Sequence, residues 1–333
     1  MTMKAILMTR TGPAEVLTLG DIPEPVLTEP TQIKVRLRAA GINPIDTKIR
    51  RNGLPGPGPL PAILGCDGAG EVIEIGSAVD RFRVGDRVWF CHGGLGIEPG
   101  NYAEVIVLDQ CWAAPMPQSL DFIHAAAGPL VLITAWGMLF DRGRLQDGQT
   151  VLIHAGAGGV SHVALQLAKW RGARVITTVG SAENAVLTKD WGADEVINHR
   201  EQDFVAEVNR LTNGRGADLV AEMIGPEIFA RSIECTAHFG DLVTLLDPGN
   251  IPLAEARLRN LRIGFELMLT PQLRGLTAAR AHQVNILRQC GELIDAGQLK
   301  LHVSRTFPME HAAEAHRQIE TGHTLGKCVL AID

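Results

Sequence analysis

Two different rhythms of apolar and polar residues divide the chain into a β-rich first part and an alternating second part. In the first third, short apolar or alternating runs are separated by Pro and Gly, which is typical of strands joined by turns. Strands are expected there at residues 4–9, 32–39, 69–75 and 87–90. From about Asp121 onward, short apolar runs alternate with stretches of helical periodicity. The change predicts two domains, which agrees with a length of 333 residues at about 100–200 residues per domain.

The clearest helix of the second part is expected at residues 158–171, directly after the apolar run 150–155. Its apolar residues recur at i, i+3, i+4, i+7 and i+8 and form one continuous face; they are Val160, Val163, Ala164, Leu167 and Ala168. Further strands are expected at 174–179, 195–198, 218–224, 242–246 and 263–269, and further helices at 182–191, 203–211, 226–236 and 277–296. This alternation predicts an α/β fold with a doubly wound parallel sheet.

Charge and composition exclude several partners. The chain has 31 basic and 37 acidic residues, a net charge of −6, and no dense Lys/Arg run, so it is not expected to bind nucleic acid. No secretory signal is visible at the N-terminus. Residues 122–140 lack charge, but His124, Gly128, Pro129 and Gly137 interrupt them, so no membrane span is expected. Six cysteines without a CxxC pair indicate free thiols and a cytoplasmic protein.

A glycine-rich loop stands between the first strand and the first helix of the second part. In that context a GxGxxG-like pattern predicts dinucleotide binding. Gly156 permits the tight turn, Gly158 lets the backbone approach a pyrophosphate, and the helix start offers N–H groups to that anion. Ser161 replaces the third glycine. The alternative is a glycine-rich turn without a ligand. The loop residues expected to bind the cofactor are Gly156, Ala157, Gly158, Gly159 and Val160.

The end of the following strand indicates which dinucleotide is bound. NAD enzymes usually carry an acidic residue there for the ribose 2′-hydroxyl, but this strand runs into Gly180 and Ser181 without one. Ser181 can donate a hydrogen bond to a 2′-phosphate, and His199 and Arg200 follow the next strand. Glu183 is interpreted as a charge in the first turn of a helix. The sequence therefore favours NADP(H).

Several segments together resemble the medium-chain dehydrogenase/reductase superfamily, and within it the zinc-free quinone oxidoreductases related to ζ-crystallin. Besides the glycine loop, they are residues 40–47, 64–72, 84–88, 192–198 and 326–330. The resemblance implies a discontinuous GroES-like, β-rich catalytic domain formed by residues 1–122 and 271–333. It also implies a Rossmann domain at 123–270 and an active site in the cleft between the two domains.

The same resemblance predicts the absence of zinc. Zinc-containing relatives carry a cysteine in the first of these segments and a His-Glu pair in the second, where this chain has Asn43, Cys66 and Asp67. Cys91 and Cys111 stand alone, so the group of cysteines that binds structural zinc in those relatives is missing as well.

Without zinc, the resemblance implies reduction of an electrophilic small-molecule acceptor, a quinone or an α,β-unsaturated carbonyl, by hydride transfer from NADPH. The candidate catalytic residues are Asn43, Asp46 and Lys48. Asn43 is a candidate hydrogen-bond donor to the acceptor, or only a turn former before Pro44. Asp46 is expected to orient the loop. Lys48 stands where many relatives have tyrosine, and either contacts the acceptor or is a solvated surface residue.

Three alternatives to this function stay open. They are an enoyl or aldehyde reductase of the same superfamily, a relative of the zinc-type alcohol dehydrogenases, and a nucleotide-binding protein without catalytic activity.

Further contacts are implied by the resemblance alone. Thr134 is expected beside the nicotinamide, and Ile224, Gly225 and Leu246 at strand ends over the cofactor. Lys327 is expected to approach the cofactor from the catalytic domain. Asn184 stands where several relatives have a lysine for the 2′-phosphate.

The remaining expectations concern assembly and three histidines. A homodimer is expected to form through the edge strand from Ile263 to Leu269. His154 is expected to pack at a strand end, and His311 and His316 are expected on the surface.

Overall fold

The computed structural model describes residues 1–333, which form two compact units. Unit 1 contains Met1–Val131, Leu269–Gly297 and Leu301–Asp333, and unit 2 contains Leu132–Met268 and Gln298–Lys300. The structure places the first division later than the sequence analysis, which ends the first domain at residue 122. The reason is helix α2 (Phe122–Ala127), which packs against strands of unit 1.

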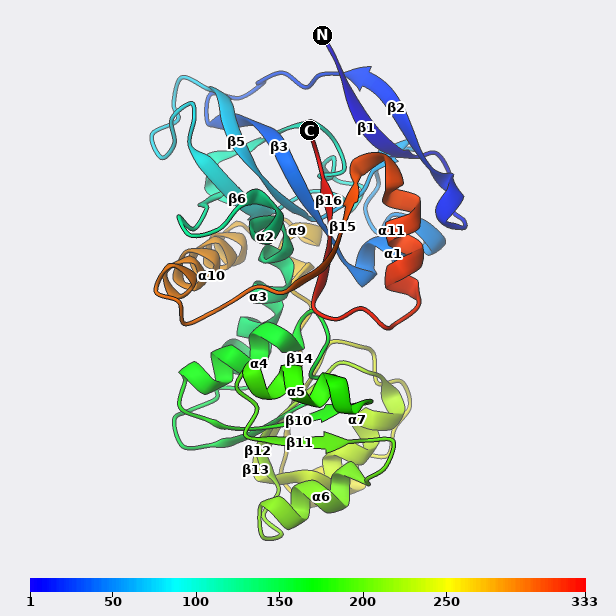
Figure 1. Cartoon of the computed structure of the whole chain (residues 1–333), viewed down its shortest axis with the longest axis vertical. Coiled ribbons are helices and arrows are strands. Elements are labelled where there is room, and N and C mark those ends of the chain that lie inside the picture. Colours follow the sequence, from blue (N-terminus) through cyan, green and yellow to red (C-terminus); the bar gives the residue numbers. More distant parts are fainter. The chain divides into compact units, whose positions relative to one another are not determined.

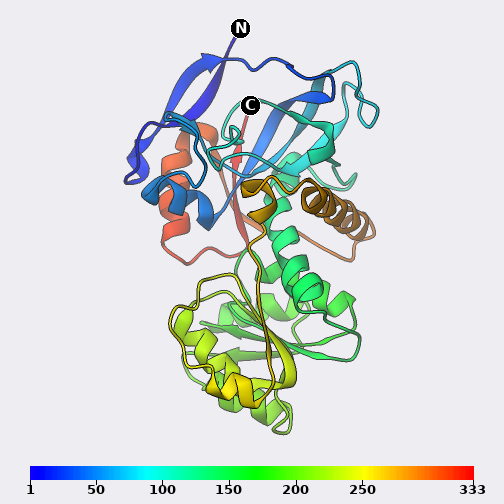
Figure 2. The same ribbon diagram turned by 180° about the vertical axis from the view of Figure 1, so that it is seen from behind.

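Unit 1 is the β-rich part of the chain (Figure 2). Its strands are β1 (Thr2–Met8), β2 (Leu17–Pro23), β3 (Gln32–Ile42), β4 (Ala62–Ile63), β5 (Asp67–Ile75), β6 (Arg87–Cys91), β7 (Val105–Asp109), β8 (Ala114–Pro115), β15 (Val303–Pro308) and β16 (Lys327–Ala331). Its helices are α1 (Pro44–Asn52), α2, α9 (Thr270–Leu273), α10 (Thr277–Asp295) and α11 (Ala312–Glu320), with short 3-10 turns η1 (Ala14–Val16), η2 (Gln110–Trp112) and η5 (Met309–His311).

The long strand β3 organises unit 1. It lies inside a seven-stranded sheet in the order β15-β16-β3-β5-β6-β8, and β7 also pairs with β3. Strand β16, from the end of the chain, pairs antiparallel with β3, so the C-terminal segment completes a sheet begun by the N-terminal one. A second sheet has the order β2-β1-β4. The discontinuous β-rich domain expected from the sequence is therefore confirmed as an arrangement of strands.

Unit 2 alternates strands and helices as the sequence predicts. Its strands are β9 (Thr150–Ile153), β10 (Arg174–Val179), β11 (Glu195–Asn198), β12 (Ala217–Glu222), β13 (Thr236–Thr244) and β14 (Arg262–Phe265). Its helices are α4 (Ser161–Trp170), α5 (Ala182–Asp190), α6 (Phe204–Leu211), α7 (Pro226–Ser232), the 3-10 turn η4 (Ile233–Cys235) and α8 (Ala254–Leu258). Helix α3 (Pro129–Trp136) crosses the division between the units and continues into a π-helical segment η3 (Gly137–Arg142).

All pairings in the unit 2 sheet are parallel, in the order β11-β10-β9-β12-β13-β14. The chain moves outward from β9 to β11, returns to β12 beside β9, and moves outward again to β14. Helices α4 and α5 lie on one side of the sheet and α6 on the other (Figure 1). This is the doubly wound Rossmann arrangement, whose ligands bind at the carboxyl ends of the strands where the order reverses. The reversal lies between β9 and β12.

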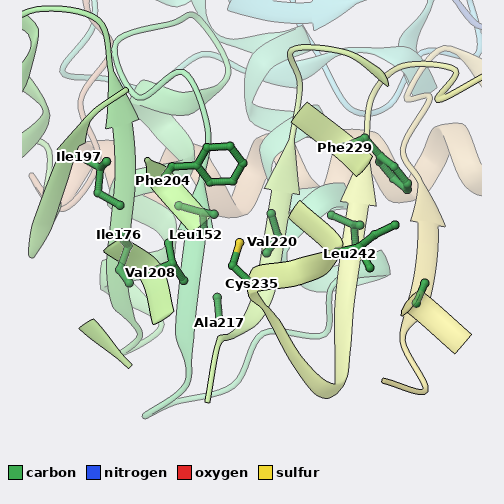
Figure 3. Close-up of a cluster of buried hydrophobic side chains, with 12 residues drawn as sticks. Leu152, Ile176, Ile197, Phe204, Val208, Ala217, Val220, Phe229, Cys235 and Leu242 are labelled. Carbon is green, nitrogen blue, oxygen red and sulfur yellow. The ribbon is translucent and has the colours of Figure 1, made fainter. Parts of the chain in front are cut away.

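A compact apolar layer holds one face of this sheet (Figure 3). Strand residues Leu152, Val220 and Leu242 are buried there against Phe204 and Val208 of helix α6. The strands are nearly continuous apolar runs because a parallel sheet is covered on both faces. The rigid layer fixes the strand ends that carry the candidate site.

The bounds of two expected strands change in the structure. The strand expected at 242–246 starts and ends earlier, because β13 spans Thr236–Thr244. The strand expected from Ile263 to Leu269 is shorter, because β14 ends at Phe265 and the chain then turns toward α9. Its place at the sheet edge is as expected. No helix of the structure combines the length and the apolar character that a bilayer span requires.

Candidate functional site

The glycine loop forms a tight turn at the carboxyl end of β9. The Gly156 N–H donates to the carbonyl of Thr178 on β10 (2.9 Å). A Cβ on Gly156 would lie 2.4 Å from the hydroxyl oxygen of Thr177. Glycine is required at this position because the neighbouring strand leaves no room for a side chain. The preceding Ala155 has a φ of 52°, in the left-handed region that makes the turn sharp.

Gly158 is glycine for a different reason. A Cβ there would meet only the Ala155 carbonyl at 3.1 Å and the Ser161 hydroxyl at 3.9 Å. A side chain at Gly158 would therefore occupy the space in front of the loop rather than collide with a neighbouring strand. The loop leads into α4, and the N-cap residue Val160 has no side chain that caps the helix. Uncapped N–H groups and the helix dipole at this end favour an anion, such as a pyrophosphate.

Two buried residues fasten the loop to the sheet. The Ser161 hydroxyl donates to the carbonyl of His154 (2.9 Å), so the residue in place of the third glycine ties α4 to the end of β9. The imidazole of His154 contacts the hydroxyls of Thr178 (3.2 Å) and Ser232 (3.0 Å). Burial lowers the pKa of His154 to about 3. His154 therefore packs at the strand end as expected.

A second group of the expected cofactor residues meets at the ends of β10 and β11. A Cβ on Gly180 would lie 3.2 Å from His199 Nε2 and 3.4 Å from Arg200 Nε, so both side chains lie against this glycine. Ser181 is the N-cap of α5 and accepts from the Asn184 N–H (3.3 Å). His199 and Arg200 are exposed. A cation, a ring nitrogen and a hydroxyl thus surround a glycine, which suits a phosphate group.

Glu183, the acidic residue close to this group, lies in the first turn of helix α5, as expected. Its own backbone N–H and then the Ser181 hydroxyl lower the pKa of Glu183, which is exposed at the start of α5. The Ser181 hydroxyl therefore already has the Glu183 carboxylate as a partner.

The third part of the site lies at the ends of β12 and β13, where Ile224, Gly225 and Leu246 were expected. The Ile224 side chain is 46% exposed, which is unusual for a large apolar residue next to a sheet. The buried carboxylate of Glu222 holds the turn by accepting the N–H groups of Ile224 (2.5 Å) and Gly225 (2.7 Å). Glu222 is not among the residues expected from the sequence, although an acid that follows the apolar run Leu219–Ala221 at a strand end is a recognisable signal.

Thr134 lies on α3 in the unit 2 part of that helix. Its side chain is 4% exposed and thus nearly enclosed by protein.

In unit 1, Asn43 and Asp46 build the start of helix α1. The Asn43 N–H donates to Asp46 Oδ2 (2.8 Å) and the Asp46 N–H donates to the Asn43 carbonyl (3.0 Å). Pro44 occupies the first helical position, where its fixed φ favours the helix and its missing N–H is not needed. The orienting role expected for Asp46 thus has a physical basis, and so does the turn-forming interpretation of Asn43.

The side-chain amide of Asn43 is already engaged inside unit 1. Its Nδ2 donates to Asp67 Oδ2 (2.9 Å), and its Oδ1 accepts from the Lys327 ammonium group. Lys327 also donates to the Ile42 carbonyl (2.8 Å) and lies 3.8 Å from Asp67 Oδ2. Both side chains are almost fully buried. Lys327, expected at the cofactor, therefore has its partners among residues of unit 1.

A chain of hydrogen bonds leads from Asp46 to helix α11. The Tyr102 hydroxyl donates to Asp46 Oδ2 (3.0 Å), and the His316 Nε2 lies 3.3 Å from that hydroxyl oxygen. Burial raises the pKa of Asp46 from 3.8 to about 7, against the lowering effect of the Asn43 N–H and the Tyr102 hydroxyl. Burial lowers the pKa of His316 to about 3.

The surface position expected for His316 is wrong, while His311 is exposed. Helix α11 packs against α1 and the sheet of unit 1, so its inner face carries His316 into the core. The buried position of His316 depends on its contact with Tyr102, which is distant in the sequence. A sequence alone does not show that contact.

Lys48 differs from the other two candidate catalytic residues. It lies on α1, one turn after Pro44, and is exposed, whereas Asn43 and Asp46 are buried. Among the three, its side chain is the one that reaches solvent from unit 1.

The residues at the positions of the zinc ligands do not fit a metal site. No group of three or more His, Cys, Asp or Glu side chains is arranged to hold a metal ion. Asn43 offers only a neutral amide, and that amide already donates to Asp67. The cation next to Asp67 is the ammonium group of Lys327, and burial raises the pKa of Asp67. The contact with Cys91 and then burial raise the pKa of Cys66, which keeps this thiol protonated.

Comparison with known proteins matches both units. A family model described as an alcohol dehydrogenase GroES-like domain matches residues 29–118, and one described as a zinc-binding dehydrogenase matches residues 191–330. A quinone oxidoreductase of Pseudomonas aeruginosa is 35% identical over 98% of this chain and 99% of its own. A 2-haloacrylate reductase of a Burkholderia species is 31% identical over 90% of this chain and 91% of its own.

Solved structures resemble the whole chain as well. The Escherichia coli quinone oxidoreductase complexed with NADPH has a TM-score of 0.87 and 30% identity, covering 99% of this chain and 100% of that one. An NAD-dependent alcohol dehydrogenase has a TM-score of 0.89 and 34% identity with the same coverage. The Rossmann sheet and the GroES-like domain expected from the sequence are thereby confirmed.

Proposed function

The chain belongs to the quinone oxidoreductase group of the medium-chain dehydrogenase/reductase superfamily, and from this premise we propose that it is an NADPH-dependent reductase of quinones or α,β-unsaturated carbonyls that works without zinc. The observation that carries the proposal is the glycine loop of unit 2, in which Gly158 leaves space before an uncapped helix start. The NADPH-bound relative from Escherichia coli supports the choice of cofactor.

The residues of unit 2 would hold NADPH in three places. The loop from Gly156 to Val160 would bind the pyrophosphate through backbone N–H groups other than those of Gly156 and Gly158, which donate to the Thr178 and Ala155 carbonyls. Ser181, His199 and Arg200 would bind the 2′-phosphate around Gly180. At the other end, Ile224, Gly225, Leu246 and Thr134 would line the nicotinamide. When bound, the cofactor supplies the hydride, while the chain supplies position and hydrogen bonds.

The three candidate catalytic residues Asn43, Asp46 and Lys48 have different roles in the proposed binding of the acceptor. Asn43 and Asp46 fix the start of α1, and the exposed Lys48 projects from that helix. We therefore assign the direct contact with the acceptor to Lys48, as a cationic donor to a carbonyl or carboxylate oxygen. Asn43 keeps one amide proton beyond the one given to Asp67 and is the second donor.

A second substrate class is favoured by this same lysine. The relative from Burkholderia is a 2-haloacrylate reductase, and an acrylate carries a carboxylate. An exposed ammonium group suits a carboxylate better than a quinone. Comparing Lys48→Met with the unchanged protein decides between the two classes, because loss of turnover only with acrylates would identify an α,β-unsaturated carboxylate as the acceptor.

The experiment that tests the proposed function is a screen of acceptors. NADPH consumption is followed with quinones, enones, aldehydes and acrylates, and with NADH in place of NADPH. We expect turnover with quinones or α,β-unsaturated compounds and a higher kcat/KM for NADPH. Tighter binding of NADH in a calorimetric titration would reject the proposed cofactor preference, and turnover with saturated aldehydes alone would reject the proposed acceptor class.

Location in the cytoplasm is part of the proposal. All six cysteines are free thiols, and four of them are buried. Free thiols are usual where glutathione and thioredoxin keep proteins reduced.

A further inference from the structure

Glu222 is a buried carboxylate at the carboxyl edge of the unit 2 sheet. It is the last residue of β12 and its side chain is fully buried. One carboxylate oxygen, Oε1, accepts the N–H groups of Ile224 (2.5 Å) and Gly225 (2.7 Å). The other, Oε2, accepts the hydroxyl of Thr244 (2.6 Å). The side chain acts only as an acceptor, which is the role of an ionised carboxylate.

The Thr244 hydroxyl extends this contact to the neighbouring strand. Thr244 ends β13 and is the register partner of Glu222. Its Oγ1 accepts from the Leu246 N–H (3.1 Å), and the Leu245 N–H donates to the Glu222 carbonyl (3.1 Å). A single carboxylate therefore fixes the ends of two adjacent strands, and with them the backbone that presents Ile224, Gly225 and Leu246.

The contacts that Glu222 makes with the two strand ends do not require a charged side chain. Its three partners are neutral donors, two backbone N–H groups and a hydroxyl. Burying a carboxylate without a cation is unfavourable, and an uncharged acceptor would hold the same N–H groups. Asp218, at the opposite end of the same strand, accepts from the Thr150 N–H but is paired with Arg215. The unpaired negative charge is thus particular to the end where ligands of such sheets bind.

We propose that Glu222 is a positioning residue of the cofactor site and that its fixed negative charge favours the oxidised over the reduced nicotinamide. This inference rests on the function proposed above. The nicotinamide ring is neutral in NADPH and positively charged in NADP+. When a hydride passes from the ring to the acceptor and a proton is taken up from solvent, a positive charge appears on the ring. A carboxylate held at the carboxyl edge stabilises that charge.

Two variants separate the charge from the geometry. Glu222→Gln keeps the length and an oxygen for the Ile224 and Gly225 N–H groups, while its amide nitrogen can donate to Thr244. Glu222→Asp keeps the charge but is one methylene too short to hold the turn. The measurement is the dissociation constant of NADP+ and of NADPH by calorimetry, taken as a ratio for each protein.

For Glu222→Gln we expect NADP+ to bind about threefold or more weakly relative to NADPH, with little change for NADPH itself. For Glu222→Asp we expect the affinities for NADP+ and for NADPH to fall by the same factor, so that the ratio of the two dissociation constants does not change. The matched control is Asp218→Asn, which lowers stability at the other end of β12 and leaves the ratio unchanged. If Glu222→Gln does not fold, Glu222→Met provides an uncharged residue of similar length.

An unchanged ratio in the uncharged variants would overturn the proposed electrostatic role. Unchanged affinities in Glu222→Asp would overturn the positioning role. The proposed function is tested separately by the unaltered protein. If it binds neither nucleotide, the function fails, whereas normal binding with an unaffected ratio in the variants rejects only the role of Glu222.

Discussion

The ammonium group of Lys327 donates to the side-chain oxygen of Asn43, at the junction of strand β3 and helix α1. This contact decides which way the amide of Asn43 points, because its oxygen must face the ammonium group and its nitrogen must face Asp67. The segment from Ile42 to Asp46 is thereby joined to β5 and to β16, the last strand of the chain.

We expect Lys327→Met to destabilise the protein by about 3–5 kcal/mol, because it leaves the Asp67 carboxylate buried without its cation. The double variant Lys327→Met with Asp67→Asn removes both charges and should regain part of that loss, with a coupling of about 1–3 kcal/mol. Denaturant unfolding measures both values. Lys48→Met, a matched removal of an exposed lysine, should change stability by less than about 0.5 kcal/mol. Additive effects of the two substitutions would show that the pair is not coupled.

Asp46 gives the stability of unit 1 a specific pH dependence. Burial raises its pKa from 3.8 to about 7, so between these values the folded state binds a proton that the unfolded state has lost. The stabilisation from the protonated carboxyl is complete below about pH 4 and is lost as the pH rises toward 7. The stability of Asp46→Asn relative to the unaltered protein should therefore rise over this range.

The measurement is the free energy of unfolding of both proteins from pH 4 to pH 8. Taking the difference between them removes the opposite effect of buried histidines such as His154, whose lowered pKa makes folding less favourable as the pH falls. A difference that stays constant with pH would contradict the buried, protonated state of Asp46.

The two glycines of the loop should respond differently to an added methyl group. In Gly156→Ala the Cβ collides with Thr177, so the protein should lose about 1–3 kcal/mol of stability. In Gly158→Ala the Cβ occupies the ligand side of the loop. Its stability should change by less than about 1 kcal/mol, while NADPH binds tenfold or more weakly, a difference of about 1.4 kcal/mol or more. Thermal unfolding and calorimetric titration separate the two effects, and normal NADPH affinity in Gly158→Ala would reject the pyrophosphate site.

The edge strand β14 is the surface through which we expect a homodimer to form. Its outer side has no partner strand in the sheet, and Phe265 and Leu267 are 57% and 53% exposed. We expect light scattering at micromolar concentration to give twice the mass of the chain. Phe265→Lys should lower that mass toward a monomer, because a charge on an edge strand opposes pairing. A monomeric mass of the unaltered protein would contradict the dimer.

The parts of the fold that depend on local pattern could be predicted from the sequence. Strands β10 and β11 have the expected bounds, since each is a short apolar run between turn residues. The tight turn at Gly156 lies where the strand, loop and helix around it predict one. The end of β14 could not be predicted, because Leu267 continues the apolar pattern after the sheet pairing has ended.

Long-range contacts explain the rest of the differences. His316 is a polar residue between Ala315 and Arg317 on α11, and its contact with Tyr102, more than two hundred positions earlier, lies in the core. Lys327 lies beside Asn43 because β16 pairs with β3. The sequence contained Glu222 at a strand end, but its hold on Thr244 depends on the register of two parallel strands. His316 was therefore misplaced and Glu222 was missed, because both act through distant partners.

The central claim is metal-independent hydride transfer from NADPH, and one measurement tests it most directly. The protein is treated with a chelator, its metal content is determined, and NADPH consumption is followed with a quinone and with an enone. We predict that the metal-depleted protein consumes NADPH in equal amount to the acceptor reduced, at an undiminished rate. Activity that disappears with the metal and returns with zinc, or no consumption of NADPH with either acceptor, would contradict the account.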